Sequence, residues 1–347
     1  MLMESKFDFL KNNVVLVKND YYKKYFSGVS DIEGYLLFGK EKAFFTDSRY
    51  FLRLKELLSN TEITPVLYNG IDCIKKYLKQ KGIKKVYIDY DSVTLSELLL
   101  EYKKLKVKLK NGTDILKELR AVKTPEELIS IQKACEITEK SFYEILPFIK
   151  EGITELEVKN LLEKQYIKNG ASGPSFETIV AFNKNSAIPH HKTSQTKLTK
   201  NSVVLIDTGC VYNGYCSDFT RTFYFGEPSQ KFIDAYNAVL NANILAIEKI
   251  TNGITGKQAD KTARDYLEKG YKDKFTHSLG HGIGLEIHEF PYLSKRGESA
   301  LKNGMAFTIE PGVYFDEEFG IRIEDTVVLL DGKVKRLYKD EKKLLII

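Results

Sequence analysis

The stretch LIDTGCVYNGYCSDFTRTF, residues 205–223, constrains the fold more than any other part of the sequence. Asn213-Gly214 lies between two runs of strand-forming residues, and this dipeptide favours a two-residue type I′ turn because both of its positions need positive φ. Provided that no bulge intervenes, the turn predicts a hairpin in which Asp207 pairs with Thr220. Because side chains alternate faces along a strand, Asp218 then shares a face with Asp207 as its diagonal neighbour.

Two carboxylates on one half-buried face repel each other and lose hydration. This arrangement costs several kcal/mol unless something compensates for it. Arg221, a shared proton or bound cations are the candidates. A solvated hairpin pair with a structural arginine partner is the alternative, and this stretch alone does not decide between them.

Composition bounds the class of protein. The chain has 347 residues, which indicates two domains of ordinary size or one large one, and 43% hydrophobic with 29% charged residues is typical of a soluble globular protein. The net charge of +6 comes without a basic cluster interleaved with aromatic residues, so we expect no nucleic-acid binding. We expect no signal peptide, and no apolar run reaches the ~18 residues of a membrane helix. Four scattered cysteines indicate free thiols and a cytoplasmic protein.

The pattern of elements changes near residue 112. Residues 1–112 alternate short strand-like and helical runs, which predicts an α/β domain. Residues 113–347 predict an α+β domain, with helices packed on a curved antiparallel sheet. Capping boxes mark three of its helix starts, and the strand-rich stretches are 202–225, 305–314 and 321–330; the capping boxes are Thr124–Glu127, Thr154–Glu157 and Thr255–Gln258.

All five histidines lie beyond residue 189, in two phrases: SAIPHHKTS and FTHSLGHGIGLEIHEFP. This clustering favours chemistry, because histidine is a leading metal ligand and acid–base group. Glycines around His281 would let the backbone approach a ligand closely. Glu310 and Glu324 each interrupt a strand that reads as buried.

These residues, taken together with the hairpin, suit a dinuclear metal centre. Four carboxylates would balance two divalent cations. Ligation by many oxygens and one imidazole favours Mn²⁺, with Co²⁺ or Zn²⁺ as alternatives. The predicted ligands are Asp207, Asp218, His281, Glu310 and Glu324.

The same phrases resemble a known family. LIDTG, YCSDFTRTF, SLGHGIGLEIHE, TIEPGVY and GIRIEDTVVL match, in order, the metal-ligand phrases of the pita-bread metallopeptidases, in the branch of Xaa-Pro aminopeptidases and prolidases. SAIPHHKTS resembles the phrase that carries an additional active-site histidine. TDSRY, residues 46–50, resembles the hallmark of the creatinase-type N-terminal domain, so the resemblance covers nearly the whole chain.

The resemblance implies a role for each matching residue. Asp207 would chelate one metal, Asp218 and Glu324 would bridge both, and His281 and Glu310 would hold the other. Glu310 would also take a proton from the shared water. His288 would contact the scissile carbonyl. The remaining implied site residues are His190 and His277, on the proline side of the substrate pocket and able to assist proton transfer, and Tyr314 and Arg322, which support substrate binding. We interpret Arg221, Asp325 and His191 as structural or solvent-facing.

The implied activity is hydrolysis of the N-terminal Xaa-Pro bond of peptides, with a water shared by two metal ions as the nucleophile. The proline preference comes from the resemblance alone. Our main interpretation is an Xaa-Pro aminopeptidase, and the alternative is an Xaa-Pro dipeptidase. A catalytically silent relative that acts as an interaction module is less favoured, since no ligand is lost. The creatinase-type domain argues against a methionine aminopeptidase, and the intact ligand set argues against a creatinase. Family members are commonly dimers, so we expect a homodimer.

Overall fold

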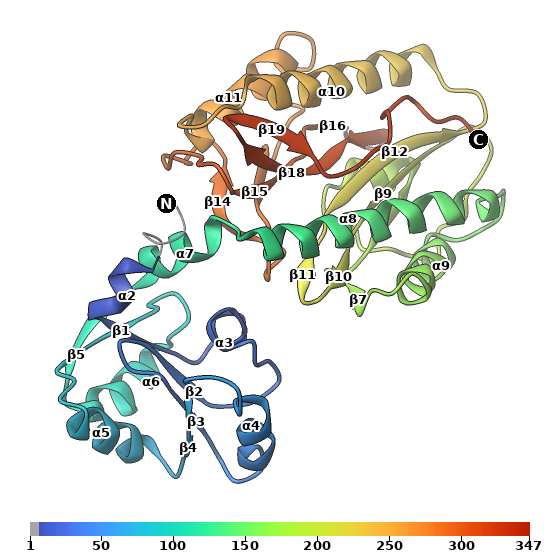
Figure 1. Cartoon of the computed structure of the whole chain (residues 1–347). Helices are drawn as coiled ribbons and strands as arrows, with labels where there is room; N and C mark the ends of the chain where they lie inside the picture. The colour runs from blue at the N-terminus through green and yellow to red at the C-terminus, as the bar shows by residue number, and fades with distance from the viewer. Residues whose placement is uncertain (1–6) are drawn as a thin grey trace. The chain divides into compact units, whose positions relative to one another are not determined.

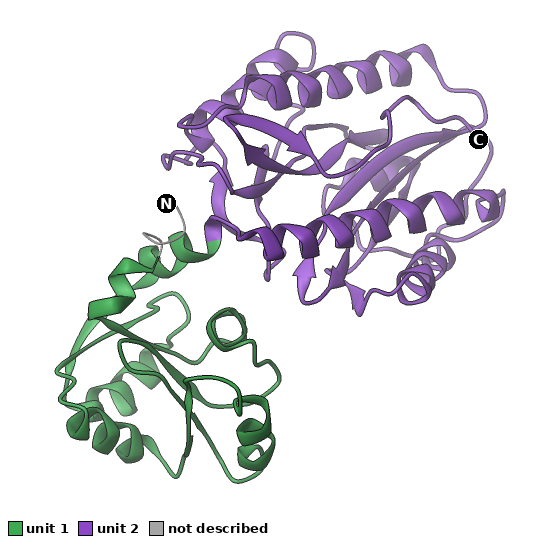
Figure 2. Ribbon diagram, in the orientation of Figure 1, with its two compact units in different colours: residues 1–120 green, residues 121–347 purple. Residues whose placement is uncertain are grey.

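The chain divides into two compact units, residues 1–120 and 121–347, in the computed structural model, which describes residues 7–347 (Figure 2). The boundary therefore lies after residue 120 rather than after residue 112, where the sequence placed it. Helix α7 (Thr113–Ala121) accounts for the difference, because Leu116 and Leu119 pack into a hydrophobic core of the first unit.

The first unit is built on a six-stranded mixed sheet in the order β4-β3-β2-β1-β5-β6. The β1–β2 and β2–β3 pairs are antiparallel, and the other three pairs are parallel. The strands are β1 (Val14–Val17), β2 (Tyr35–Gly39), β3 (Ala43–Thr46), β4 (Thr64–Leu67), β5 (Lys85–Ile88) and β6 (Lys108–Asn111); the helices before α7 are α2 (Asp8–Asn12), α3 (Asp20–Ser27), α4 (Phe51–Leu57), α5 (Ile71–Gln80), α6 (Leu95–Leu100) and the 3₁₀ turn η1 (Tyr102–Leu105).

Helix α5 shows how the sequence pattern produces this packing. Ile71, Ile74 and Leu78 recur at helical spacing and are buried against the sheet. The lysines of the same helix lie on its other face, as expected for a solvated surface. The predicted α/β organisation of this part of the chain is thus observed.

The second unit is built on a long antiparallel sheet in the order β14-β13-β15-β18-β12-β9-β8, with β19 paired to β18 (Figure 1). Two smaller sheets, β11-β10-β7 and β16-β17, accompany it. The strands are β7 (Gly173–Pro174), β8 (Ile179–Phe182), β9 (Ser202–Thr208), β10 (Cys210–Tyr212), β11 (Tyr215–Cys216), β12 (Phe219–Phe225), β13 (Gly280–Gly282), β14 (Glu289–Leu293), β15 (Ala306–Ile309), β16 (Gly312–Phe315), β17 (Phe319–Arg322), β18 (Glu324–Leu330) and β19 (Lys333–Arg336).

The helices of this unit begin where the capping residues predict. Thr124, Thr154 and Thr255 each form a complete capping box, at the starts of α8, α9 and α11. Among residues 7–347, no helix is long and apolar enough to cross a membrane. The helices are α8 (Pro125–Ile145), α9 (Glu155–Lys168), α10 (Gln230–Lys249) and α11 (Gly256–Leu267), with the 3₁₀ turns η2 (Leu146–Phe148) and η3 (Asn183–Ala187).

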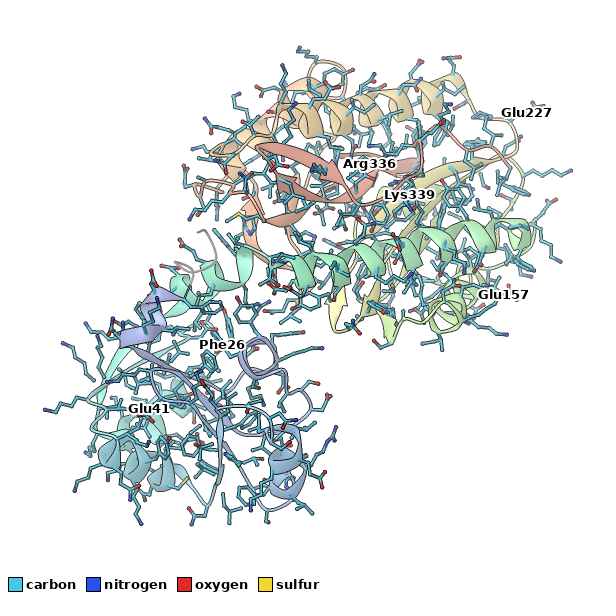
Figure 3. All side chains as sticks on the ribbon, viewed as in Figure 1. Phe26, Glu41, Glu157, Glu227, Arg336 and Lys339 are labelled. Carbon is cyan, nitrogen blue, oxygen red and sulfur yellow. The ribbon has the colours of Figure 1, made fainter. Side chains whose placement is uncertain are left out.

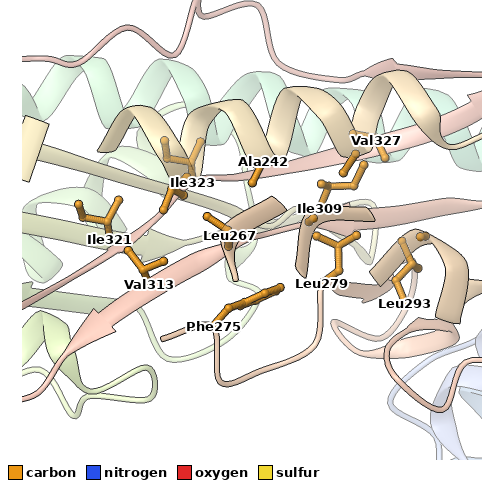
Figure 4. Packing of buried hydrophobic residues seen from close by; sticks show 14 of the residues in the cluster. Ala242, Leu267, Phe275, Leu279, Leu293, Ile309, Val313, Ile321, Ile323 and Val327 are labelled. Carbon is orange, nitrogen blue, oxygen red and sulfur yellow. The ribbon is translucent and has the colours of Figure 1, made fainter. Parts of the chain in front are cut away.

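Two hydrophobic cores join these helices to the sheet. In one core, Ala242 of α10 and Leu267 of α11 pack with sheet residues such as Ile309 and Val327 (Figure 4). The other core joins α8 and α9 to β9 and β12, through residues such as Phe219. Two helix pairs therefore brace the sheet, and the strand ends that they hold carry the polar side chains considered next.

The hairpin register predicted from Asn213-Gly214 is confirmed. Asn213 has φ 51° and Gly214 has φ 82°, as a type I′ turn requires. Asp207 pairs with Thr220 across β9 and β12, and Val211 pairs with Cys216 nearer the turn. The register is continuous, although the tip of the hairpin belongs to the small β7-β10-β11 sheet.

Candidate metal centre

The five predicted metal ligands line one cavity of about 440 Å³ in the second unit. They come from five neighbouring strands or strand ends. Asp207 lies on β9, Asp218 directly precedes β12, His281 lies on β13, Glu310 directly follows β15, and Glu324 begins β18. The other lining residues are Phe176, Ile179, Pro189, His190, His277, Ser278, Gly280, Ile287, His288, Tyr292, Ser294 and Arg322.

Strand register explains why residues so far apart in the sequence meet here. Thr220 of β12 pairs with Asp207 on one side and with Glu324 on the other, so both acids stand in one row across three strands. The hydroxyl of Thr220 donates to Glu324 Oε2 at 2.6 Å, which fixes that carboxylate. In β13, Gly280 leaves room for the carbonyl oxygen of Thr308 in β15, which a Cβ at position 280 would meet at 2.0 Å. A glycine before His281 is therefore what allows β13 to approach β15.

His281 presents its Nε2 atom to the acids. Its Nδ1 lies 3.1 Å from the carbonyl oxygen of Gly282, and because a carbonyl can only accept, Nδ1 carries the proton. Nε2 then lies 3.5 Å from Asp218 Oδ2 and 3.5 Å from Glu310 Oε1. Ligand atoms of Asp218, His281 and Glu324 all lie within 4.8 Å of one another. A ring nitrogen and carboxylate oxygens at these distances need a cation between them, either a proton or a metal ion.

The acids of the cavity carry more negative charge than the chain neutralises. We call Asp207, Asp218, Glu310 and Glu324 the cavity cluster. Burial and the charge of Asp207 raise the pKa of Asp218 well above its ordinary value, and burial and the charge of Asp218 do the same for Glu324. Burial and the charge of Glu324 raise the pKa of Glu310 to about 8.

Only one guanidinium faces the cavity cluster among the described lining residues. Arg322 Nη2 donates to Asp207 Oδ2 at 2.5 Å, whereas Asp207 Oδ1 is buried without a hydrogen-bond partner. Four carboxylates, one of them with an unpaired oxygen, and an imidazole nitrogen fit divalent cations bound mainly by oxygen. The individual metal-binding roles of these residues stay predictions.

A hydrogen-bonded chain connects Asp207 to His277. Arg322 Nη1 donates to the hydroxyl of Tyr314 at 2.7 Å, and His277 Nε2 lies 2.8 Å from the same hydroxyl. His277 Nδ1 donates to the carbonyl of Ser278, so Nε2 accepts from Tyr314. Burial and the charge of Arg322 lower the pKa of His277 to about 3, which keeps the ring neutral. Both of its nitrogens are engaged, so in this arrangement the ring is a wall of the cavity rather than a proton donor.

The predicted substrate-binding residues therefore divide into two groups. Tyr314 is not among the cavity-lining residues; it contacts His277 and Arg322 instead of the open space. His190 and His288 line the cavity and form no hydrogen bond with other described residues, so their ring nitrogens are available to a ligand. The His288 ring stands edge-on to that of His281 at 4.3 Å, and burial with the charge of His281 lowers the pKa of His288 to about 4.

Charged residues that the sequence did not single out hold the histidine-bearing segments. Arg264 of α11 donates to the carbonyl oxygen of His277 at 2.7 Å. Lys123 forms a buried ion pair at 2.5 Å with Glu289, the residue that directly follows His288 in the chain. Glu155 contacts the segment that carries His190. Each of these residues reads locally as an ordinary helix or surface charge, so no short pattern could have marked it.

Comparison with known proteins agrees with this geometry. The family model of metallopeptidase family M24 matches residues 130–331. The chain is 39% identical to an Xaa-Pro dipeptidase of Pyrococcus furiosus, with 92% of each chain covered. Its structure is similar to that of an Xaa-Pro dipeptidase from Bacillus anthracis, with TM-score 0.92, 36% identity, and 99% of this chain and 98% of that one covered. It is also similar to an X-Pro aminopeptidase from Thermotoga maritima, with TM-score 0.91, 35% identity and 99% of each chain covered.

These matches confirm the resemblance that the five phrases indicated, together with the predicted fold class of an α/β region followed by an α+β pita-bread domain. The chain therefore belongs to metallopeptidase family M24, and it is a hydrolase of peptide bonds.

Proposed function

We propose that this metallopeptidase is an Xaa-Pro dipeptidase, which hydrolyses the bond before proline in a dipeptide. The observation that carries the proposal is the cavity in which four carboxylates and a histidine ring nitrogen converge beside two unbonded histidines. The names of its relatives support the substrate class, since proteins that are similar over nearly the whole chain are named Xaa-Pro dipeptidase. A cavity of about 440 Å³ is the size of a small-ligand site.

The cavity cluster would hold two divalent cations, with Mn²⁺ as the proposed metal. When bound, the cations would lower the pKa of a water to near neutrality and stabilise negative charge on the carbonyl oxygen. Asp207, Asp218, His281, Glu310 and Glu324 are the proposed ligands. The homodimer and the cytoplasmic location stay predictions from the sequence.

The chain's own residues would orient the peptide and move the proton. His288 has a free ring nitrogen beside His281, from which an N–H can donate to the scissile carbonyl oxygen. Glu310 can take the proton of the attacking water at a carboxylate oxygen and return it to the proline nitrogen as that nitrogen leaves. Proline nitrogen carries no N–H in the peptide, so this added proton is what completes the amine. His190 and His277 would form the walls that receive the proline ring.

An Xaa-Pro aminopeptidase is the second candidate, and it was the main interpretation of the sequence alone. It is favoured by the similarity to the X-Pro aminopeptidase from Thermotoga maritima, which is nearly as strong as the similarity to the dipeptidases. The two activities differ in whether the cavity accepts residues beyond proline.

The test is to offer the purified protein with Mn²⁺ three peptides in parallel: Gly-Pro, Ala-Pro-Xaa and Met-Ala-Xaa. We expect hydrolysis of Gly-Pro alone. Release of alanine from Ala-Pro-Xaa would instead make the protein an aminopeptidase, and release of methionine only from Met-Ala-Xaa would overturn the substrate class. Asp218→Asn, which removes a proposed bridging ligand, is the negative control for all three reactions.

A further inference from the structure

A fully buried glutamate anchors the segment that carries His190. Glu155 is the first residue of α9, and its side chain has no exposure to solvent. We call residues 183–194, which lie between β8 and β9, the His190 loop. The carboxylate of Glu155 accepts five hydrogen bonds, four of them from this loop; the donors are Phe182 N (2.8 Å), Asn185 Nδ2 (2.8 Å), His191 Nε2 (2.9 Å), Ser194 N (2.9 Å) and Ser194 Oγ (2.7 Å).

These donors keep the carboxylate charged. Burial alone would raise the pKa of Glu155, but the hydrogen bonds from Asn185, His191 and Ser194 outweigh it and lower the pKa. The positive end of the α9 dipole, at which Glu155 lies, favours the same state. An ionised acid with several donors is a stronger and more directional anchor than a neutral amide, because charge-assisted hydrogen bonds are roughly twice as strong as neutral ones.

A second set of contacts fixes the opposite side of the loop. The backbone N–H of Gly320 donates to Ser186 Oγ at 2.8 Å, and Arg322 Nη1 lies 3.4 Å from the carbonyl oxygen of Pro189. Arg322 is the residue that pairs with Asp207 in the cavity cluster. The His190 loop is thus held between α9 and the strand that carries Arg322. His190 itself, which directly follows Pro189, forms no hydrogen bond with other described residues and lines the cavity.

We propose that Glu155 is a positioning residue for substrate binding: its carboxylate orders the His190 loop and so holds His190 against the proline side of the substrate. This inference rests on the proposed function, which assigns His190 to the substrate pocket. The alternative is that Glu155 only stabilises the start of α9. That task is already performed by Thr154 and Glu157, which form the capping box of the same helix turn.

Two matched variants separate the alternatives. Glu155→Gln removes the charged acceptor, and Glu157→Gln removes the same charge from the capping box of the same turn without touching the His190 loop; Glu157 is exposed on α9 (Figure 3). We expect Glu155→Gln to raise KM for Gly-Pro about tenfold with a smaller change in kcat, because misplacing a substrate-contacting side chain weakens binding. We expect Glu157→Gln to leave KM unchanged. The number of bound Mn²⁺ ions should equal that of the wild type in both variants.

A double-mutant cycle shows whether Glu155 acts through His190. His190→Ala alone should raise KM, and adding Glu155→Gln should raise it no further, because the side chain that Glu155 positions is gone. Additive effects would contradict the proposal, as would equal KM values for Glu155→Gln and Glu157→Gln. If Glu155→Gln does not fold, Ser194→Ala, which removes one donor, should raise KM in the same direction, and an unchanged KM would overturn the proposal.

Amide hydrogen exchange tests the role of Glu155 independently of the proposed function. If the wild-type protein hydrolyses no Xaa-Pro bond, the proposed function is wrong. Glu155→Gln should still speed amide exchange in residues 183–194 relative to Glu157→Gln, because it frees the loop rather than the helix start. Equal exchange rates of residues 183–194 in the two variants would show that Glu155 does not anchor the His190 loop, whichever peptides the enzyme hydrolyses.

Discussion

Two clusters of buried or half-buried acids lie on opposite faces of the sheet, and they differ in how the chain neutralises them. Glu324 and Asp325 are neighbours on β18, so their side chains point to opposite faces. Glu324 belongs to the cavity cluster. Asp325 belongs to what we call the rear cluster, which consists of Asp325, Asp340, Arg221, Arg336 and Lys342.

The rear cluster supplies its own cations. Asp325 accepts from Arg221 at 2.9 Å, from Arg336 at 3.0 Å and from Lys342 at 2.7 Å. Asp340 accepts from Arg221 and Arg336 at 2.7 Å each. Burial alone would raise the pKa of Asp325, but the charges of Arg221, Lys342 and Arg336 hold it well below its usual range. The prediction that Arg221 and Asp325 are structural thus agrees with their burial in this network.

The comparison shows that burial does not distinguish the clusters. Asp218, Glu324 and Asp325 are all buried, yet the pKa values of the first two are raised and that of the third is lowered. What differs is the number of permanent protein cations: three for two acids in the rear cluster, and Arg322, beside the titratable ring of His281, for four acids in the cavity cluster. The chain leaves negative charge in the cavity for a ligand to neutralise, and each of the following predictions tests that difference.

The largest expected effect follows from neutralising an acid of the cavity cluster. Asp218→Asn should lower kcat/KM for Gly-Pro by about 10³-fold, because it removes a proposed bridging ligand of both cations. In metal-free protein the same change should raise stability by about 1 kcal/mol, because it removes the cost of burying an acid beside the other acids of the cluster. Peptide hydrolysis, metal counting and thermal unfolding in EDTA measure the three consequences. Full activity with two bound metals would exclude the bridging role.

The equivalent change in the rear cluster should have the opposite effect on stability. Asp325→Asn leaves Arg221, Arg336 and Lys342 with one acid fewer, and removing one partner of a buried ion network costs about 3 kcal/mol. Denaturant unfolding of metal-free protein measures the loss. Asp331→Asn is the matched control, because Asp331 is exposed and should change stability by less than about 0.5 kcal/mol. Similar values for the two variants would mean that the rear cluster does not stabilise the fold.

Local rules account for what the sequence could predict. Asn213-Gly214 fixed the register that pairs Asp207 with Thr220, because a two-residue turn leaves one way to align its strands. Thr154 marked the start of α9 through a capping box that spans four residues. Four of the candidate ligands stood out because an acid in an apolar strand breaks a short pattern, and His281 stood out because the histidines cluster in two phrases; all five line one cavity.

Contacts between distant residues could not be predicted in this way. Arg221 and Asp325 are 104 positions apart, and no spacing rule says which cations the acid beside Glu324 meets on its own face of the sheet. Glu155 looks like any first-turn acid of a helix, although it anchors a loop. The domain boundary was placed too early for a similar reason, since the pattern of α7 shows an apolar face but not which core buries Leu116.

The pH dependence of stability should also separate the clusters. In metal-free protein the pKa of Glu310 is about 8, whereas an exposed glutamate has a pKa of ~4.3. Between these values the folded state binds a proton that the unfolded state lacks, so stability should fall as pH rises, by up to about 1.4 kcal/mol per pH unit from Glu310 alone. The raised pKa values of Asp218 and Glu324 act in the same direction. Asp325 and Asp340, whose pKa values are lowered, stabilise the fold above the ordinary aspartate pKa and add no slope in this range.

Mn²⁺ should remove this slope, because cations replace protons on the cavity cluster. Melting temperatures from pH 5 to pH 8, in EDTA and in Mn²⁺, measure the effect. A slope that persists unchanged in Mn²⁺ would mean that the titrating group lies outside the metal centre.

The smallest expected effect tests how the rear cluster uses its cations. Arg336 on β19 (Figure 3) donates to Asp325 through Nε and Nη2 and to Asp340 through Nη2. Arg336→Lys keeps the charge but removes the forked donor geometry, so we expect a loss of about 1 kcal/mol in unfolding free energy. The control is Lys335→Arg, the reverse exchange at an exposed neighbour, which should change nothing measurable. Metal affinity and kcat should stay at wild-type values in both variants, because Asp325 and Asp340 lie on the face away from the cavity. A weaker metal affinity in Arg336→Lys would show that the two clusters are coupled through β18 and are not independent charge systems.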